Sequence, residues 1–334
     1  MAGSGFGTNF RITTWGETHG AGVGVVVDGC PAGLPLERED VQKYLDRRKP
    51  GQSKYTTQRK EGDQVEILSG IFEGRTTGTP ISMVVYNKDQ RSKDYSNIKD
   101  IYRPGHADFT FDMKYGFRDY RGGGRSSGRE TIGRVAAGAV AAKVLKELGI
   151  EIKAYAKAIA GIEVSKEHFD FAEMNNNPFN MPDKEAAKLV QEKADQMIKE
   201  MDSIGGIIEC QITGMPVGIG ETVFDKLDAE LSKAIMSIGS VKGFEAANLR
   251  GSENNDDFIC VDGKVEKETN HSGGVLGGMS DGSAIVFRAA IKPTPSIAQT
   301  QKTVNRDLDN VEIEIHGRHD PMIVPRAVVV VESM

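Results

Sequence analysis

Residues 103–145 read RPGHADFTFDMKYGFRDYRGGGRSSGRETIGRVAAGAVAAKVL, and this stretch decides the fold that we expect. A segment rich in aromatic and charged residues leads into a glycine loop, and from Gly128 onward helix formers and small residues dominate. We expect a helix from about Glu130 to Leu148 that stops at Gly149. Its alanine, valine and glycine residues have almost no bulk, so the helix can pack closely against other elements and should be deeply buried.

The glycine loop RGGGRSS at 121–127 predicts an anion site at the start of this helix. Free backbone N–H groups and the positive end of the helix dipole meet there, which suits a phosphate or a polycarboxylate. The alternative is an ordinary helix capped by Ser126 or Ser127, with its arginines in water. Fixed positive charge around the loop would come from Arg121, Arg125, Arg129 and Arg134.

The length and composition indicate a soluble globular protein of one large domain or two ordinary ones. Its 334 residues suffice for a sizeable core, and 38% hydrophobic with 27% charged residues is typical of globular proteins. The net charge of -6 argues against a general nucleic-acid binder. Cys30, Cys210 and Cys260 form no CxxC pair, so we expect no disulfide framework and no metal site, in keeping with a reducing cytoplasm. Neither a signal-peptide pattern nor an apolar run of about 20 residues is present.

Two further loops in the first 60 residues are candidates for function. His19 lies in GETHG at 16–20, where glycines let a ligand approach closely, although most single histidines are structural or exposed. RRKPGQSKYTTQRK at 47–60 carries six lysines and arginines and no acid. This basic loop is either a solvated surface loop or a lid over an anionic substrate. Pro50 and Gly51 exclude one continuous helix through it.

The periodicity of the remaining chain predicts a mixed α+β protein. Strands are expected at 11–15, 22–29, 65–71, 81–86, 150–161, 204–213, 283–291 and 311–315, and helices at 37–47, 130–148, 184–201 and 225–238. We expect one domain over residues 1–334 with a helical insertion at about 165–203. Residues 25–45 and 207–231 both read strand, G-x-P-x-G, helix, which is consistent with an internal duplication.

The last third contains NHSGGVLGGMSDG at 270–282, the extended segment KPTPS at 292–296, and HGRHDP at 316–321. Arg318, His319 and Asp320 form a compact polar cluster there, for which simple turn chemistry is the alternative interpretation.

Taken together, these segments resemble the chorismate synthases over nearly the whole chain and in the same order. The resemblance is carried by WGETHG (15–20), DRRKPGQSKYTTQRKEGDQVEILSG (46–70), TTGTPI (76–81), DQRSKDY (89–95), the stretch at 103–141, MSIGSVKGFE (236–245), HSGGVLGGMSDG (271–282), KPTPSI (292–297) and GRHDPMIVPRA (317–327). RGGGRSSGRET and GRHDP are highly specific in combination.

The resemblance implies a β-α-β sandwich, with central helices layered between two antiparallel sheets, assembled as a homotetramer. It also implies conversion of 5-enolpyruvylshikimate 3-phosphate to chorismate, the last step of the shikimate pathway in aromatic amino-acid biosynthesis. Phosphate leaves from C3 and a hydrogen from C6, an anti-1,4-elimination that depends on reduced FMN. Whether NADPH reduces the flavin on this protein or an external flavin reductase does so is left open.

The resemblance also assigns roles to residues. The catalytic set is His19, His106 and Asp320. The substrate would be bound by Arg48, Lys54, Ser127, Arg134 and Arg318, since planar guanidinium groups suit phosphates and carboxylates. FMN would be bound by Arg125, Ser126, Ser127, Gly239, Ser240, Gly277, Lys292, Pro293, Thr294, Pro295, Ser296 and Arg318.

Two other functions were weighed against this one. A non-catalytic sensor of phosphorylated metabolites would need the anion site, but not His19, His106 and Asp320 together. An RNA-binding module using residues 47–60 would bind RNA with a steep salt dependence. The acidic net charge and the absence of an RNA-binding signature disfavour that module, and we expect no membrane partner either.

Overall fold

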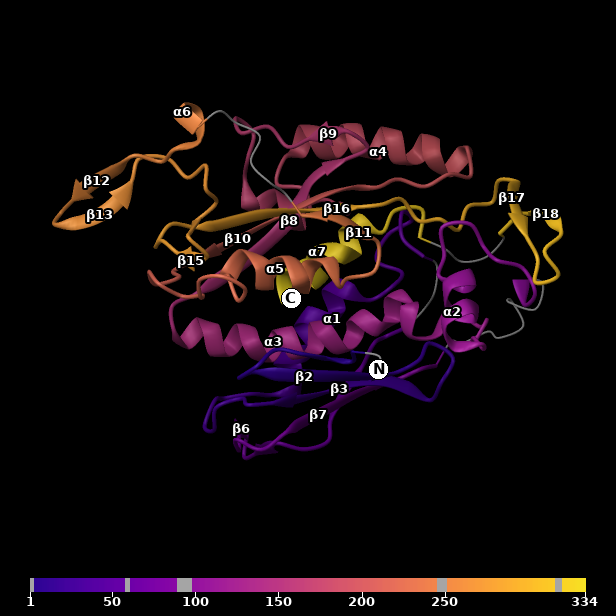
Figure 1. Ribbon diagram of the computed structural model, residues 1–334, viewed down its shortest axis with the longest axis horizontal. Coiled ribbons are helices and arrows are strands. Elements are labelled where there is room, and N and C mark those ends of the chain that lie inside the picture. Colours follow the sequence, from indigo (N-terminus) through magenta and orange to yellow (C-terminus); the bar gives the residue numbers. More distant parts are fainter. Residues whose placement is uncertain (1–2, 58–60, 89–97, 245–250, 316–319) are drawn as a thin grey trace.

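Two five-stranded antiparallel sheets enclose a layer of helices (Figure 1). The computed structural model describes residues 3–57, 61–88, 98–244, 251–315 and 320–334. The α+β class and the sandwich of helices between two antiparallel sheets are both confirmed.

The first sheet is built from the N-terminal 86 residues. Its strand order is β1 (Gly5–Phe6), β2 (Arg11–Gly16), β3 (Gly22–Asp28), β7 (Ile81–Tyr86) and β4 (Val65–Ile67). Val23, Val25 and Val27 of the central strand are buried against the helices. These β-branched residues alternate along β3, so one face of the sheet supplies half of the core.

The second sheet has the order β11 (Val241–Phe244), β16 (Ile285–Ile291), β10 (Gly206–Thr213), β8 (Glu151–Ile159) and β9 (Ile162–Glu163). The two segments of the suspected duplication give β3 followed by α1 (Arg38–Arg48) and β10 followed by α5 (Leu227–Met236). Each strand is the central one of its sheet, which is the arrangement that a duplication requires.

The layer between the sheets contains α1 (Arg38–Arg48), α3 (Thr131–Glu147), α5 (Leu227–Met236) and α7 (Val324–Ser333), as Figure 1 shows. α7 is held at its end by Glu332, whose carboxylate accepts hydrogen bonds from both terminal nitrogens of Arg47 and from the Ala154 N–H. This one carboxylate therefore joins α7 to α1 and to the second sheet.

The small residues of α3 allow it to fill the centre, as its composition predicts. Eight of its residues from Ile132 to Val140 are buried. A Cβ atom added at Gly133 would lie 3.0 Å from the Gly24 carbonyl oxygen of the first sheet. A Cβ atom added at Gly138 would lie 2.4 Å from Ser333 Cβ and 2.7 Å from its carbonyl oxygen in α7. The two neighbours of α3 can approach this closely only because these side chains are absent.

Several shorter elements lie outside the sandwich. Helix α4 (Lys184–Lys199) covers the outer face of the second sheet, α2 (Asp108–Tyr115) packs beside strands β17 and β18, and β12 and β13 form a projecting hairpin (Figure 1). The remaining bounds are β5 (Ile71–Phe72), β6 (Arg75–Thr76), η2 (Gly124–Ser126), η3 (Gly128–Glu130), η4 (Phe171–Asn175), α6 (Gly251–Asn254), β12 (Phe258–Val261), β13 (Lys264–Lys267), β14 (Val275–Leu276), β15 (Met279–Ser280), β17 (Gln301–Val304) and β18 (Asn310–Ile313).

Two sequence expectations need correction. The single strand expected at 65–71 is two strands, β4 and β5, because Gly70 has a φ of 83° and turns the chain between them. The helices α2 and α7 were not expected. Separately, no helix within the described ranges is long and apolar enough to cross a lipid bilayer.

We expect Gly138→Val to destabilise the protein. The valine side chain would meet backbone atoms of Ser333, which cannot rotate away, and overpacking a core typically costs about 1–3 kcal/mol. Lys146→Val is the matched control because it places the same residue at an exposed position of the same helix, where the change should stay within about 0.5 kcal/mol. Thermal or denaturant unfolding measures both, and equal stability of the two variants would contradict the close contact of α3 with α7.

Candidate active site

The start of α3 is organised by one buried carboxylate, that of Asp63. Its two oxygens accept from different arginines: Oδ2 lies 2.5 Å from Arg48 Nη1, and Oδ1 lies 3.1 Å from Arg129 Nη1. The Asp63 side chain is fully buried, and the two arginines are only 1% and 6% exposed. Two buried cations therefore share one buried anion, with Glu61 nearby at 3.8 Å from Arg129 Nη1.

Arg48 joins the end of α1 to the start of α3. Its Nε donates to Thr131 Oγ1 at 2.9 Å and its Nη2 donates to the Gly128 carbonyl at 3.2 Å. Burial lowers the pKa of Arg48 to about 9, an effect that the attraction of Asp63 opposes, so the side chain stays charged at neutral pH. Three of its five N–H groups are thus bonded to the protein itself.

Arg129 continues this network to the His19 loop. Its Nε donates to Asn87 Oδ1 at 3.0 Å, and Asn87 Nδ2 donates to the carbonyls of Glu17 and Gly20 at 2.9 Å each. Arg129 Nη2 is buried and has no hydrogen-bond partner among the residues that the structure describes.

His19 is 8% exposed and packs against the glycine loop. Gly122 has a φ of 73°, and a Cβ atom there would lie 2.8 Å from His19 Cδ2, so the ring fills the space that the missing side chain leaves. Asp119 lies close to this ring. Burial acts to raise the pKa of Asp119, but hydrogen bonds from Arg121 hold it below its usual range, and the charge of a protonated His19 acts in the same direction.

Asp320 lies beside the basic loop. Its Oδ1 accepts from the Thr57 N–H at 2.8 Å and its Oδ2 accepts from Arg326 Nη1 at 2.7 Å. Arg326 also donates through Nε to the Arg48 carbonyl at 3.0 Å. Asp320 is therefore linked through Arg326 and Arg48 to Asp63, and from there to the His19 loop.

His106 meets the KPTPS segment. Its Nε2 lies 2.8 Å from Ser296 Oγ, and Lys292 Nζ donates to the neighbouring Gly105 carbonyl at 2.7 Å. Burial and the nearby positive charge of Lys242 both lower the pKa of Lys292. The resemblance had placed His106 and Ser296 at one site, although 190 residues separate them, and the structure brings them into contact.

The His106 and Asp320 regions are adjacent through residues 203 and 204. Ser203 Oγ donates to the Thr294 carbonyl at 2.6 Å, and the Ile204 N–H donates to the Pro321 carbonyl at 3.0 Å. The Thr294 hydroxyl oxygen is buried without a hydrogen-bond partner in the described part of the chain.

Residues 237–240 contact both Lys292 and Arg134. The Lys292 N–H donates to the Ser240 carbonyl at 2.9 Å. Arg134 donates to Ser237 Oγ at 2.5 Å and to its carbonyl at 3.2 Å, and it also pairs with Glu130 at 2.8 Å. A side chain at Gly239 would meet no atom within 4 Å.

Three other predicted residues lie in the glycine loop. Arg125 donates to Thr14 Oγ1 at 2.7 Å and to the Gly16 carbonyl at 3.2 Å. Ser126 Oγ bonds to the Gly123 carbonyl, and Ser127 Oγ caps η3 by accepting from the Arg129 N–H at 3.4 Å. Arg125 and Arg134 both pair with Glu130, at 3.6 and 2.8 Å, whereas Arg129 pairs with Asp63 and Arg121 with Asp119.

Two predicted residues lie apart from these contacts, and a third cannot be placed. Lys54 is 62% exposed and pairs with Asp195 of α4 at 2.7 Å. Gly277 lies near the beginning of β16, since Gly273 and Gly274 contact residues 284–286, whereas Lys292 follows its end. The seven residues of β16 therefore lie between the Gly277 turn and Lys292 along this part of the sheet. Arg318 lies outside the described residues.

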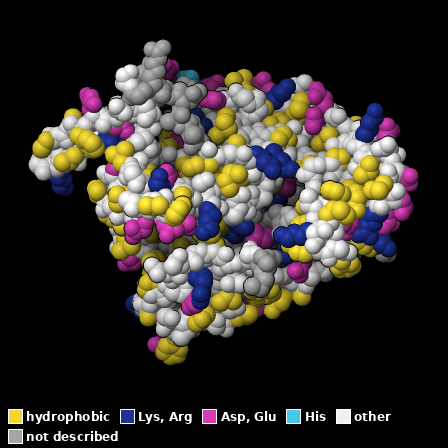
Figure 2. Space-filling view, viewed as in Figure 1, with side chains coloured by type: hydrophobic (Ala, Val, Ile, Leu, Met, Phe, Trp, Pro, Cys, Tyr) yellow, Lys and Arg dark blue, Asp and Glu magenta, His cyan; other side chains and the backbone are white. Residues whose placement is uncertain are grey.

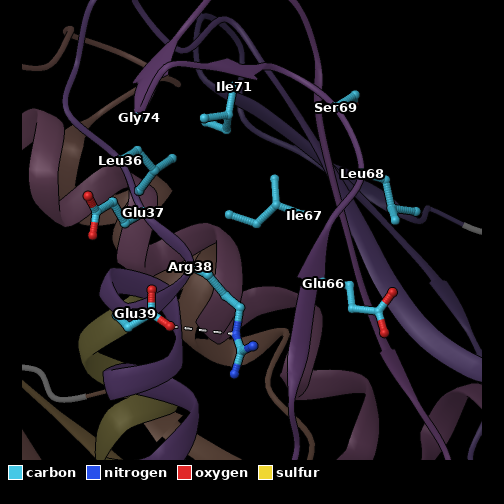
Figure 3. Close-up of a pocket in the computed structure, with 10 residues that line it drawn as sticks. All are labelled: Leu36, Glu37, Arg38, Glu39, Glu66, Ile67, Leu68, Ser69, Ile71 and Gly74. Atoms are coloured by element: carbon cyan, nitrogen blue, oxygen red, sulfur yellow. Dashed lines mark ion pairs between the residues drawn. The ribbon is translucent and has the colours of Figure 1, made fainter.

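One face of the molecule carries a hollow beside the α2 region, with Lys and Arg side chains around it (Figure 2). A different pocket, of about 610 Å³, lies between the start of α1 and β4 (Figure 3). Its lining includes Glu37, Glu39 and Glu66 but only one cation, Arg38. This net negative lining would repel an anionic ligand, so the candidate site is the network around the start of α3. Among the described residues no group of His, Cys, Asp and Glu could hold a metal ion.

Sequence reasoning missed five residues of this site, namely Asp63, Asn87, Arg129 as a network member, Lys242 and Arg326. Asp63, Lys242 and Arg326 lie inside the motifs quoted for the family resemblance. Asp63 also has a φ of 42°, a conformation that the sequence does not reveal. The burial of these side chains and their contacts in the folded structure are what identify them as members of the site.

Comparison with known proteins gives one consistent result. The family model described as chorismate synthase matches residues 10–334. Chorismate synthase of Lachnospira eligens is 68% identical to this chain, that of Agathobacter rectalis 64% and that of Methanococcoides burtonii 57%; each alignment covers 100% of this chain and 93%, 93% and 94% of the relative, respectively. A solved structure described as a crystal structure of chorismate synthase is 29% identical, with a TM-score of 0.76 over 98% of this chain and 89% of that one.

Asp63→Asn should strongly destabilise the protein. Asparagine keeps the size and tolerates a positive φ, but it leaves two buried guanidinium groups without their anion, and removing one partner of a buried ion pair costs about 3–5 kcal/mol. Asp46→Asn is the control, because Asp46 pairs with Lys49 at the surface at 3.0 Å, where an ion pair contributes at most about 1 kcal/mol. Denaturant unfolding compares the variants, and a loss for Asp63→Asn as small as that of the control would contradict the central role of Asp63.

Proposed function

The chain belongs to the chorismate synthase family and is a lyase, and from this premise we propose that it converts 5-enolpyruvylshikimate 3-phosphate to chorismate with the help of reduced FMN. The reaction is an anti-1,4-elimination, in which phosphate leaves from C3 and hydrogen from C6.

One observation carries the proposal: residues from four distant segments are linked at one end of the sandwich. Hydrogen bonds through Asn87, Asp63 and Arg326 connect the His19 loop to Asp320. Further hydrogen bonds connect Ser203 to the KPTPS segment and that segment to His106. These links join both histidines and the carboxylate in one connected network, which supports a shared site.

The residues around Lys292 fit a bound flavin phosphate. Burial lowers the pKa of Lys292 and the positive charge of Lys242 lowers it further, so an anion bound beside Lys292 would stabilise its charged form. The buried Thr294 hydroxyl has no partner within the described ranges and could donate to a phosphate oxygen. Arg125, Ser126, Ser127, Gly239, Ser240, Gly277, residues 292–296 and Arg318 would hold FMN. Bound there, reduced FMN would supply transient electron donation to the substrate, which would lower the barrier to phosphate loss.

His106 would act at the flavin, where its contact with Ser296 Oγ orients the imidazole. His19 would donate a proton to the departing phosphate. An imidazole has an unperturbed pKa of about 6.5, so it can supply that proton near neutral pH. The backbone of Gly122 packs against the His19 ring and limits its position.

Asp320 would relay the proton that leaves C6. Arg326 and the Thr57 N–H each bond to a different oxygen of its carboxylate, which fixes its orientation. Each carboxylate oxygen has two acceptor positions, and hydrogen bonds from the described part of the chain occupy one on each, so the proposal assigns the other to proton transfer. Arg48, Lys54, Ser127, Arg134 and Arg318 are proposed to bind the substrate's phosphate and carboxylates, with Arg48 also holding the start of α3.

The proposal also covers the oligomeric state, the cellular compartment and the source of the reduced flavin. We infer a cytoplasmic homotetramer in which NADPH or an external flavin reductase supplies the reduced flavin. These inferences rest on family membership.

The assignment is tested by an anaerobic assay with reduced FMN. The protein should release phosphate from the enolpyruvyl substrate over many turnovers without consuming the flavin. Equal phosphate release without flavin, or none with reduced flavin, would overturn the proposal. Adding NADPH to oxidised FMN with no other protein present then shows which reductant the protein uses.

Asp320→Asn should lower turnover by about 10²–10⁴, the usual contribution of a general acid or base, while FMN and substrate still bind. Asparagine keeps the shape but loses the basic oxygen. Asp28→Asn, at an exposed carboxylate paired with Arg11 at 2.7 Å, is the control and should keep full turnover. A thermal melt confirms folding. A loss below about tenfold for Asp320→Asn would exclude its role in proton transfer.

A further inference from the structure

We propose that Asn87 is a positioning residue that fixes His19 for catalysis, an inference that rests on the proposed role of His19 as a proton donor. Asn87 directly follows β7, and its backbone N–H donates to the Ala21 carbonyl at 3.1 Å, one position beyond the pairing of Gly22 with Tyr86. The first sheet therefore holds the backbone of Asn87 beside the loop that contains His19.

The side chain of Asn87 spans this loop. Its Nδ2 donates to the carbonyl of Glu17, two residues before His19, and to that of Gly20, one residue after it, at 2.9 Å each. The loop's own turn is closed by the Gly20 N–H, which donates to the Glu17 carbonyl at 3.1 Å. One amide thus binds the residues on both sides of His19 and fixes the distance between them.

The neighbours of Asn87 also determine which way its amide points. Two carbonyl oxygens can only accept, so they require the NH₂ group, and the Arg129 Nε can only donate, so it requires the oxygen at 3.0 Å. Arg129 is in turn held by Asp63 at 3.1 Å. Asn87 consequently anchors the His19 loop to the buried charge network around Asp63.

On its other side, the His19 ring meets Gly122. Loss of the Asn87 hydrogen bonds would release the backbone of the His19 loop, while the contact between the His19 ring and Gly122 would remain. A general acid must lie within hydrogen-bond reach of the atom that it protonates, and a shift of about 1 Å costs up to a hundredfold in rate. The expected effect is therefore on the chemical step rather than on substrate binding.

The test compares Asn87→Asp with Asn177→Asp. Asn177 is a matched control because its Nδ2 also bridges two backbone carbonyls of one loop, those of Glu173 and Met181 at 2.7 and 2.8 Å, in the region between β9 and α4. Both substitutions keep the acceptor oxygen and remove the two donors. Asn87→Asp should lower kcat by about ten- to a hundredfold with KM changed less than about threefold, whereas Asn177→Asp should leave both unchanged.

A double variant separates positioning from general damage. In a His19→Ala background, Asn87→Asp should lower kcat by less than about twofold, because the residue that it positions is already absent. A full ten- to hundredfold further loss in that background would overturn the inference. So would a normal kcat for Asn87→Asp when His19→Ala is slow, and in that case the proposed role of His19 would stand.

Normal turnover of His19→Ala would instead remove the proton-donor role and this inference with it. Thermal melts of Asn87→Asp and Asn177→Asp establish that the variants are folded. If the new carboxylate prevents folding of Asn87→Asp, Asn87→Ala removes the same donors without adding charge, and the same comparisons of kcat and of the double variant apply to it.

Discussion

The sharing of one buried carboxylate by two buried arginines is the constraint on which the rest of the site depends. Asp63 lies between Arg48, from the end of α1, and Arg129, from the turn before α3. Burying charge is costly unless every partner is in place, so this arrangement permits little variation in the relative positions of the two segments. Because Arg48 also bonds the start of α3 and Arg129 bonds Asn87, the same requirement extends to the His19 loop.

The layered fold makes this arrangement possible. Helix α3 fits between the first sheet and α7 only because Gly133 and Gly138 bring backbones into contact. Its first turn therefore reaches the same end of the sandwich as the loop between β2 and β3, which carries His19, and the residues after β7. The ends of strands and helices carry the reactive groups, while the regular elements between them supply rigidity. The close packing of α3 at the centre of the molecule therefore also sets the geometry of the site.

The charges of the site are also distributed in a way that composition does not reveal. Arg48, Arg121, Arg129 and Arg134 are each paired with an aspartate or a glutamate. Each of these pairs also fixes the position of the segments that it joins. Lys292 is different, because burial and Lys242 lower its pKa and the cation would gain from an anionic partner. The proposed phosphorylated substrate and cofactor would need charges of both kinds.

Local sequence determined most of the secondary structure and the identity of the family. The strands at 22–28 and 81–86, the helices at 38–48 and 131–147, and the motifs around His19, His106 and Asp320 all follow from periodicity, glycine and proline positions, or family resemblance. Tertiary structure decided the rest. Residues 324–333 contain four consecutive valines, which favour a strand, yet they form α7 because helical packing buries Val328 to Val331 between α3 and the second sheet. Likewise, no sequence pattern joins Asn87 to residues 17 and 20 or Asp63 to Arg129, since hydrogen bonds between distant segments exist only once the chain has brought their atoms within about 3 Å.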